Sequence, residues 1–94
     1  MARVRVELPS LLVRFAGAAT LEVEADTLSQ ALKALVAEHP ALSLHLFDES
    51  GAFRQHVLCF HNGTNTRWFE GPGDLDRPVA DGDEIRLMQA VSGG

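Results

Sequence analysis

Residues 27–36 read Thr-Leu-Ser-Gln-Ala-Leu-Lys-Ala-Leu-Val, and this stretch decides the fold. It opens with a capping box, in which the Thr27 hydroxyl accepts a hydrogen bond from a backbone N–H while Gln30 reaches back. Its apolar side chains then recur three and four positions apart, which predicts a helix with one apolar stripe ending before Pro40. The stripe consists of Leu28, Ala31, Leu32, Leu35 and Val36.

Two strands are predicted before this helix. Residues 3–8, Arg-Val-Arg-Val-Glu-Leu, alternate charged and apolar side chains, which places Val4, Val6 and Leu8 on one face. Residues 19–25 alternate again, with Leu21 and Val23 directed inward. We expect an antiparallel hairpin with a wide connection that begins where Pro9 ends the first strand.

Three more strands are predicted after the helix. Residues 41–55 are expected to be loosely helical and then loop. Residues 56–61 are apolar on both faces, which predicts a central strand whose outer face a partner covers. The Asn62-Gly63 turn, a short strand over Thr66–Phe69 and a last strand over residues 84–90 complete the order. This order predicts an α+β domain with two layers. If the first and last strands lie side by side and parallel, the sheet wraps one helix and the tail leaves from one end.

Composition restricts the classes of function. The chain has 94 residues, a net charge of −5 and one cysteine. Acidic proteins repel phosphate backbones, so we expect no nucleic-acid partner. One thiol forms no internal disulfide, and no apolar run has the length of a signal peptide or a membrane span. These features predict a cytoplasmic protein of one domain with no membrane partner.

No self-contained active site is evident. The histidines lack the spacing of zinc ligands with cysteine or carboxylate, Cys59 is expected as a buried inert thiol, and no phosphate-binding glycine motif occurs. Ser10 and Ser92 have no recognisable base nearby. We therefore expect no catalytic residue, no metal and no bound cofactor. The histidines are His39, His45, His56 and His61.

The final residues, Ala90-Val91-Ser92-Gly93-Gly94, suggest a different kind of chemistry. We expect residues 1–89 to fold as the domain and residues 90–94 to form a flexible tail, because glycines leave the backbone free and without bulk. Ala90, Val91, Ser92 and Gly93 would enter a partner's active site and present the Gly94 carboxylate there. A frayed terminus with no function is the alternative.

That carboxylate is a poor electrophile until it is activated. An ATP-using partner could convert Gly94 to an acyl-adenylate, and a sulfur donor or an amine could then displace AMP to give a thiocarboxylate or an isopeptide. The protein would be a carrier and substrate rather than an enzyme, and ATP would belong to the partner. Phe60, Trp68 and Phe69 are candidates for the docking surface of that partner, although aromatic residues on strands also serve as core or edge cover.

Several motifs in this order resemble the MoaD/ThiS-type sulfur-carrier proteins, which have the ubiquitin-like β-grasp fold. They are the opening strand, the capped helix, His39-Pro40-Ala41-Leu42, Phe47-Asp48-Glu49-Ser50-Gly51, Phe60-His61-Asn62-Gly63, residues 79–85 and the terminal Val91-Ser92-Gly93-Gly94. The resemblance implies a mixed sheet of four to five strands packed on one main helix. It also implies adenylation of Gly94 by a MoeB-like enzyme and formation of a thiocarboxylate.

The resemblance leaves the recipient of the sulfur open. MoaD-like members often carry Pro-Pro before the tail, where this chain has Gln89 and Ala90, and the segment from Leu8 to Leu12 looks more like the CysO branch. A cysteine synthase and a MoaE-like large subunit, with this chain as the small subunit of a heteromeric synthase, are therefore both possible acceptors. Two other functions remain open: a ubiquitin-like modifier that forms isopeptides through Gly94, and a non-covalent β-grasp interaction module.

Overall fold

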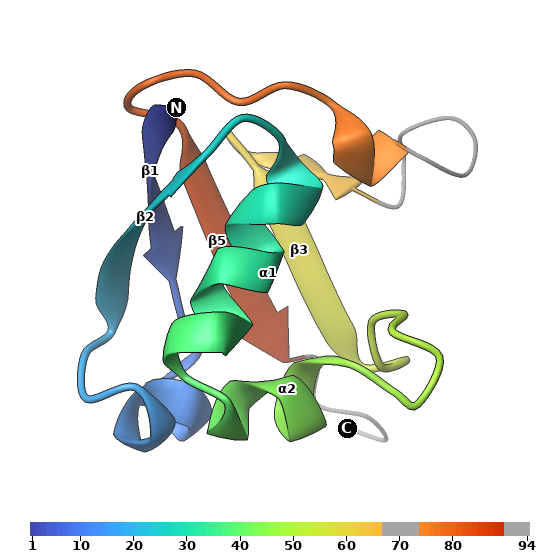
Figure 1. The fold of residues 1–94 in the computed structure, drawn as a ribbon. Coiled ribbons are helices and arrows are strands. Elements are labelled where there is room, and N and C mark those ends of the chain that lie inside the picture. The colour runs from blue at the N-terminus through green and yellow to red at the C-terminus, as the bar shows by residue number, and fades with distance from the viewer. Residues whose placement is uncertain (67–73, 90–94) are drawn as a thin grey trace.

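A computed structural model describes residues 1–66 and 74–89 of the chain. A five-stranded mixed sheet, in the order β2-β1-β5-β3-β4, carries the main helix α1 on one face (Figure 1). This arrangement confirms the predicted two-layer α+β architecture. The elements are β1 (Ala2–Glu7), the 3₁₀ helix η1 (Ser10–Phe15), β2 (Thr20–Ala25), α1 (Leu28–Glu38), α2 (Ala41–Leu46), β3 (Val57–His61), β4 (Thr64–Asn65), the 3₁₀ helix η3 (Asp74–Asp76) and β5 (Glu84–Gln89).

The first two strands form the predicted antiparallel hairpin. Val4 lies opposite Val23, and Val6 lies opposite Leu21, so the apolar residues of both strands face the helix. The wide connection contains η1, which the sequence pattern had not identified as helical. Leu12 of η1 is buried among the core residues and fixes this connection against the domain.

Helix α1 begins and ends where the sequence predicts. The Thr27 hydroxyl accepts a hydrogen bond from the Gln30 N–H at 3.1 Å. The side-chain oxygen of Gln30 accepts one from the Asp26 N–H at 2.9 Å, one residue before the position that a capping box predicts. The Leu28 N–H donates to the carbonyl of Arg77, so the segment before β5 also satisfies the helix start.

The strand that carries the C-terminus, β5, occupies the middle of the sheet. It pairs in parallel with β1, which is the side-by-side arrangement considered above, and antiparallel with β3. The prediction that residues 56–61 form the central strand is wrong, because β3 has only the two-residue β4 on its other side. Its apolar outer face therefore lies near one edge of the sheet.

A tight turn joins β3 to β4. Asn62 and Gly63 have positive φ angles of 50° and 87°, as two-residue hairpin turns require, and this explains the Asn-Gly pair. The short strand predicted from Thr66 is wrong at its start, since β4 ends at Asn65 and Thr66 lies beyond it. The rest of that predicted strand lies outside the described residues.

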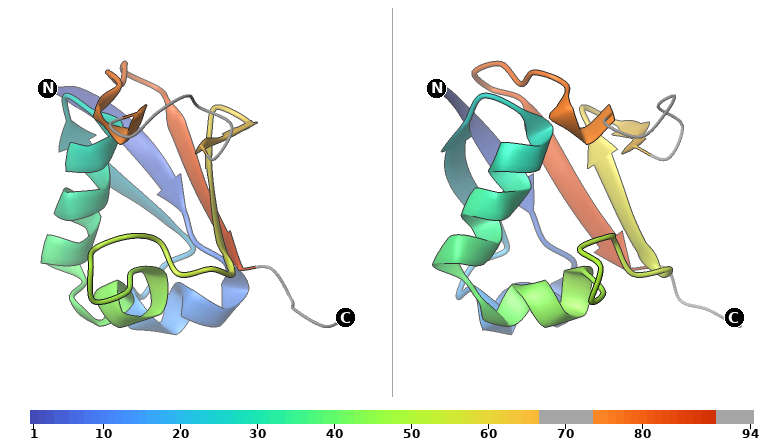
Figure 2. Two further views of the ribbon diagram at one scale, coloured as in Figure 1. Left: turned by 90° about the vertical axis from the view of Figure 1, so that its right-hand side faces the viewer. Right: turned by 45° about the vertical axis from the view of Figure 1, so that its right-hand side comes forward.

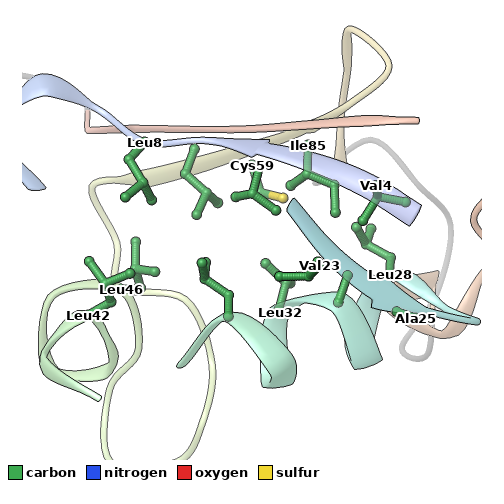
Figure 3. Packing of buried hydrophobic residues seen from close by; sticks show 14 of the residues in the cluster. Val4, Leu8, Val23, Ala25, Leu28, Leu32, Leu42, Leu46, Cys59 and Ile85 are labelled. Atoms are coloured by element: carbon green, nitrogen blue, oxygen red, sulfur yellow. The ribbon is translucent and has the colours of Figure 1, made fainter. Parts of the chain in front are cut away.

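The core fills the space between the sheet and the two α-helices (Figure 3). All strand residues predicted to point inward are buried except Leu21, which is half-buried, and the α1 stripe is buried except for Val36, which is half-buried. The segment after α1 is more regular than predicted, because residues 41–46 form the helix α2. The loop that follows α2 is stabilised by Asp48, whose carboxylate accepts hydrogen bonds from Ser50 and Ala52.

Candidate functional site

The described part of the chain leaves the sheet at Gln89, the last residue of β5. Gln89 lies opposite Val57, the first residue of β3, at the end of the sheet near η1 and α2 (Figure 2). The predicted tail, Ala90 through Gly94, lies outside the described residues. The candidate site is therefore the surface around this exit, together with the outer face of the strands that lead to it.

The outer face of β3 and β5 carries an apolar group. Phe60 and Leu58 are half-buried there, and Met88, which lies opposite Leu58, is 43% exposed. A hollow of about 380 Å³ is lined by Phe60, Gly63, Glu84, Arg86 and Met88. Phe60, one of three predicted docking residues, thus lies on an open face, whereas Trp68 and Phe69 lie outside the described residues.

Ion pairs border this apolar group. Arg86 donates to Glu7 at 2.8 Å and approaches Glu84 at 3.4 Å, and Arg3 lies 3.8 Å and 3.9 Å from Glu22 and Glu24. These pairs are exposed or half-buried, so each contributes little stability. The charged side chains thus extend from β2 and β1 onto the first half of β5, and the apolar group lies beside them on β3 and at Met88 of β5.

A hydrogen-bond network holds the start of β5. Asp83 accepts hydrogen bonds from His61 at 2.9 Å, from Asn62 at 3.0 Å and from the Ala80 N–H at 2.9 Å. Burial opposes ionisation of Asp83, but the hydrogen bonds from Ala80, Asn62 and His61 outweigh it and lower the pKa of this carboxyl. Because an ionised carboxylate only accepts, Nε2 of the buried His61 carries the proton.

We expect Asp83→Asn to lower the free energy of unfolding by about 1–3 kcal/mol at neutral pH, since the amide nitrogen cannot accept the donors that the carboxylate satisfies. The depressed pKa means that the ionised form stabilises the folded state above the unfolded value near 4. This stability is lost as pH falls through the lower, folded value. Urea denaturation at pH 7 and pH 3 should therefore show a deficit that shrinks in acid.

The control for this experiment is Asp76→Asn, because Asp76 is exposed at the end of η3. Its urea midpoint should match the wild-type midpoint at both pH values. An Asp83→Asn deficit that stays the same at pH 3 would show that the carboxylate's charge contributes nothing.

Cys59 is the only thiol in the chain, and it is 2% exposed inside the core. Burial raises the pKa of Cys59 to about 12, although a hydrogen bond with Thr66 opposes the rise. A thiol with this pKa is almost wholly protonated at neutral pH and is a poor nucleophile. The prediction of a buried thiol is confirmed, and the raised pKa agrees with the expected inertness.

The described residues offer neither a metal site nor a membrane-spanning helix. Residues 1–66 and 74–89 contain no group of three or more histidine, cysteine, aspartate or glutamate side chains that could hold a metal ion. Within the same ranges, no helix has the length and apolar character needed to cross a membrane.

Several residues of the site were not predicted. The phase of β5 identifies Ile85 and Leu87 as inward, so Met88 must point outward, and this signal could have added Met88 to Phe60. The pairing of His61 with Asp83 joins residues 22 positions apart and leaves no local pattern. The same holds for Phe15 and His45, whose rings lie near the exit at a tilt of 32°, with centroids 4.3 Å apart.

Known proteins are similar to this chain in sequence and in fold. The model of the ThiS family matches residues 6–94. Small archaeal modifier protein 1 of Haloferax volcanii is 36% identical over 86 residues, which cover 88% of this chain and 91% of that protein. Its crystal structure has a TM-score of 0.80 and 33% identity, covering 99% of this chain and 100% of that chain.

A second relative carries a different name. The sulfur carrier protein CysO of Mycobacterium tuberculosis is 30% identical over 94 residues, which cover 97% of this chain and 98% of that protein. Both relatives and the family model span nearly the whole chain, and the TM-score of 0.80 shows that the fold is similar to that of the solved structure. The chain therefore belongs to the ThiS family and has a ubiquitin-like β-grasp fold.

Proposed function

We propose that this protein is a sulfur carrier whose Gly94 carboxylate is adenylated by a MoeB-like enzyme and converted to a thiocarboxylate. The observation that carries the proposal is the family match, which extends through residue 94 and includes the terminal Gly93-Gly94. The identity to CysO supports sulfur carriage in particular. The inert Cys59 also supports it, because the chain's own thiol is unsuited to carry transferable sulfur.

The proposed chemistry has two steps. First, a Gly94 carboxylate oxygen attacks the α-phosphate of ATP, and pyrophosphate leaves. Second, a sulfur nucleophile at the sulfide level attacks the carbonyl carbon, and AMP leaves with the former carboxylate oxygen, so that the terminus becomes a thiocarboxylate. The domain takes no part in either bond change, and its role is to dock and to place the terminus in the enzyme.

The recipient of the sulfur belongs to the same proposal. A cysteine synthase or a MoaE-like large subunit of molybdopterin synthase could accept it, and the CysO relative favours the first. We propose docking of these enzymes on the outer face of β3 and β5, because Phe60, Leu58 and Met88 form an apolar group on the strands next to the exit. We place the activation of Gly94 and the transfer of sulfur in the cytoplasm, where ATP is available.

Intact-mass measurement tests the proposal. The purified chain, incubated with ATP, its adenylating enzyme and a sulfur donor, should gain the mass expected when sulfur replaces one oxygen. Oxidation of Met1 or Met88 gives a nearly equal gain, so fragmentation must place the change on Gly94. A mass change located only on methionine, with an enzyme shown to be active, counts against sulfur carriage.

One alternative function has an observation in its favour. The 36% identity to small archaeal modifier protein 1 favours a protein modifier, in which a lysine amine attacks the same adenylate and forms an isopeptide. Tryptic digestion of cell extracts, which cleaves after Arg86, would then leave remnants of residues 87–94 attached through Gly94 to target lysines. Their absence, with thiocarboxylate present, would separate the carrier from the modifier.

A further inference from the structure

On the surface beside the chain exit, the side chains of Arg14, Phe15 and His45 form a group that we call the cationic stack. The guanidinium carbon of Arg14 lies 4.9 Å from the ring centroid of Phe15, and the Phe15 ring lies 4.3 Å from that of His45. A cation over an aromatic face is attracted by the ring. Arg14 and Phe15 belong to η1 and His45 belongs to α2, so the stack joins two elements that are anchored in the core by Leu12 and Leu46.

The stack and the exit share one hollow. A depression of about 440 Å³ is lined by Ser10, Leu11, Leu12, Arg14, Phe15, His45 and Gln89. Gln89 is the last described residue before the terminal segment, and Leu11 is 71% exposed at the same place. The hollow therefore combines an exposed apolar side chain and a cation at the base of the segment that ends in Gly94.

The positive charge of Arg14 in this hollow is not balanced by a carboxylate of the described lining. None of its described lining residues is aspartate or glutamate, although the chain as a whole has a net charge of −5. Among the described residues, Arg3 and Arg86 pair with glutamates, whereas Arg14 forms no ion pair. Arg14 is thus a cation held in position by an aromatic ring rather than by a carboxylate.

Because the terminal segment is short, an enzyme that binds Gly94 must come close to this hollow. Five residues follow Gln89, and a fully extended chain of five residues spans at most about 18 Å. An enzyme that binds Gly94 in its active site must bring the mouth of that site within this distance of Gln89. The rim of the mouth then faces the surfaces around the exit, and one of these is the hollow with Arg14 and Leu11.

We infer that Arg14 and Leu11 form a second docking point for the enzyme that activates Gly94. The inference rests on the proposed function. The complementary surface is the mouth of the enzyme's active site, with an acidic side chain opposite Arg14 and an apolar side chain opposite Leu11. Electrostatic attraction at a rim of this kind acts mainly on association and on its dependence on salt.

The test compares Arg14→Glu, Arg14→Lys and Leu11→Ala in ATP–pyrophosphate exchange with the adenylating enzyme of the same organism. Lys33→Glu is the matched control, since it makes the same charge reversal at an exposed position of α1. We expect Arg14→Glu to raise KM for the carrier about three- to tenfold at low salt, with kcat unchanged. The increase should shrink with added salt, whereas the smaller increase for Leu11→Ala should not.

Arg14→Lys should retain most of the affinity, and Lys33→Glu should behave as the wild type. Equal KM values for Arg14→Glu and Lys33→Glu at low salt would overturn the inference, and so would a loss confined to kcat. Titration calorimetry of the same variants measures their affinity for the enzyme directly. It therefore tests the Arg14 contact independently of the proposed adenylation. If the wild-type chain binds the enzyme without any exchange, adenylation is rejected, and the Arg14 contact is then judged from affinity alone.

Discussion

Deletion of Gly94 should abolish adenylation and leave the free energy of unfolding within about 0.5 kcal/mol of the wild-type value. The deletion draws the terminal carboxylate back by one residue, about 3.3–3.6 Å of extended chain. Reacting atoms must approach to roughly 3–3.5 Å, so a displacement of this size removes productive geometry. Stability should not change, because the buried apolar residues of the described chain all lie between Val4 and Leu87.

The measurement is ATP–pyrophosphate exchange, combined with a urea denaturation curve for each protein. One alanine added after Gly94 is the matched variant, because it keeps both glycines but moves the carboxylate away by the same distance. It should be equally inactive. Activation of either variant at the wild-type rate would show that the reactive group is not this carboxylate, and unfolding of the deletion variant would show that the terminus is structural.

Leu32→Ala should have the largest effect on stability, about 2–5 kcal/mol of the roughly 5–15 kcal/mol available to a domain. Leu32 is 3% exposed and lies on the α1 stripe that packs against the sheet (Figure 3). Truncation removes buried methyl groups and leaves a cavity that the surrounding side chains fill only in part. For a chain of this length, each kcal/mol lowers Tm by about 4–8 °C.

Thermal unfolding followed by circular dichroism measures this effect. Lys33→Ala is the control, since Lys33 is the next residue of α1 but is exposed, and its Tm should be close to that of the wild type. If the two variants have the same Tm, the stripe does not hold the two layers together. With Leu32→Ala folded at low temperature, adenylation should still occur, because the carboxylate and the exit are unchanged.

The fold was predictable because its determinants are local. The alternation of Val4, Val6 and Leu8, the stripe of α1 and the Asn62-Gly63 turn each follow from periodicity or from the φ angles that a turn needs. The position of β3 was mistaken because a strand that is apolar on both faces need not lie in the middle of its sheet. Periodicity indicates which faces of a strand are covered, but it does not identify the strands on either side.

The candidate site was predictable only in part, for a different reason. Phe60 was identified because aromatic residues on a strand are distinctive, and Cys59 because it lies between apolar neighbours. The contact of Phe15 with His45 depends on where η1 meets α2, and these two residues are 30 positions apart. The same is true of His61 and Asp83. Such pairs are products of tertiary structure.

The place of β5 in the sheet also determines how the protein responds to force. The strand is hydrogen-bonded to β1 on one side and to β3 on the other, and its end leads directly into the terminal segment. Traction on that segment along the strand would load these bonds together in shear instead of breaking them one at a time. An enzyme could therefore bind the terminus and pull on it at every turnover while the domain stays folded.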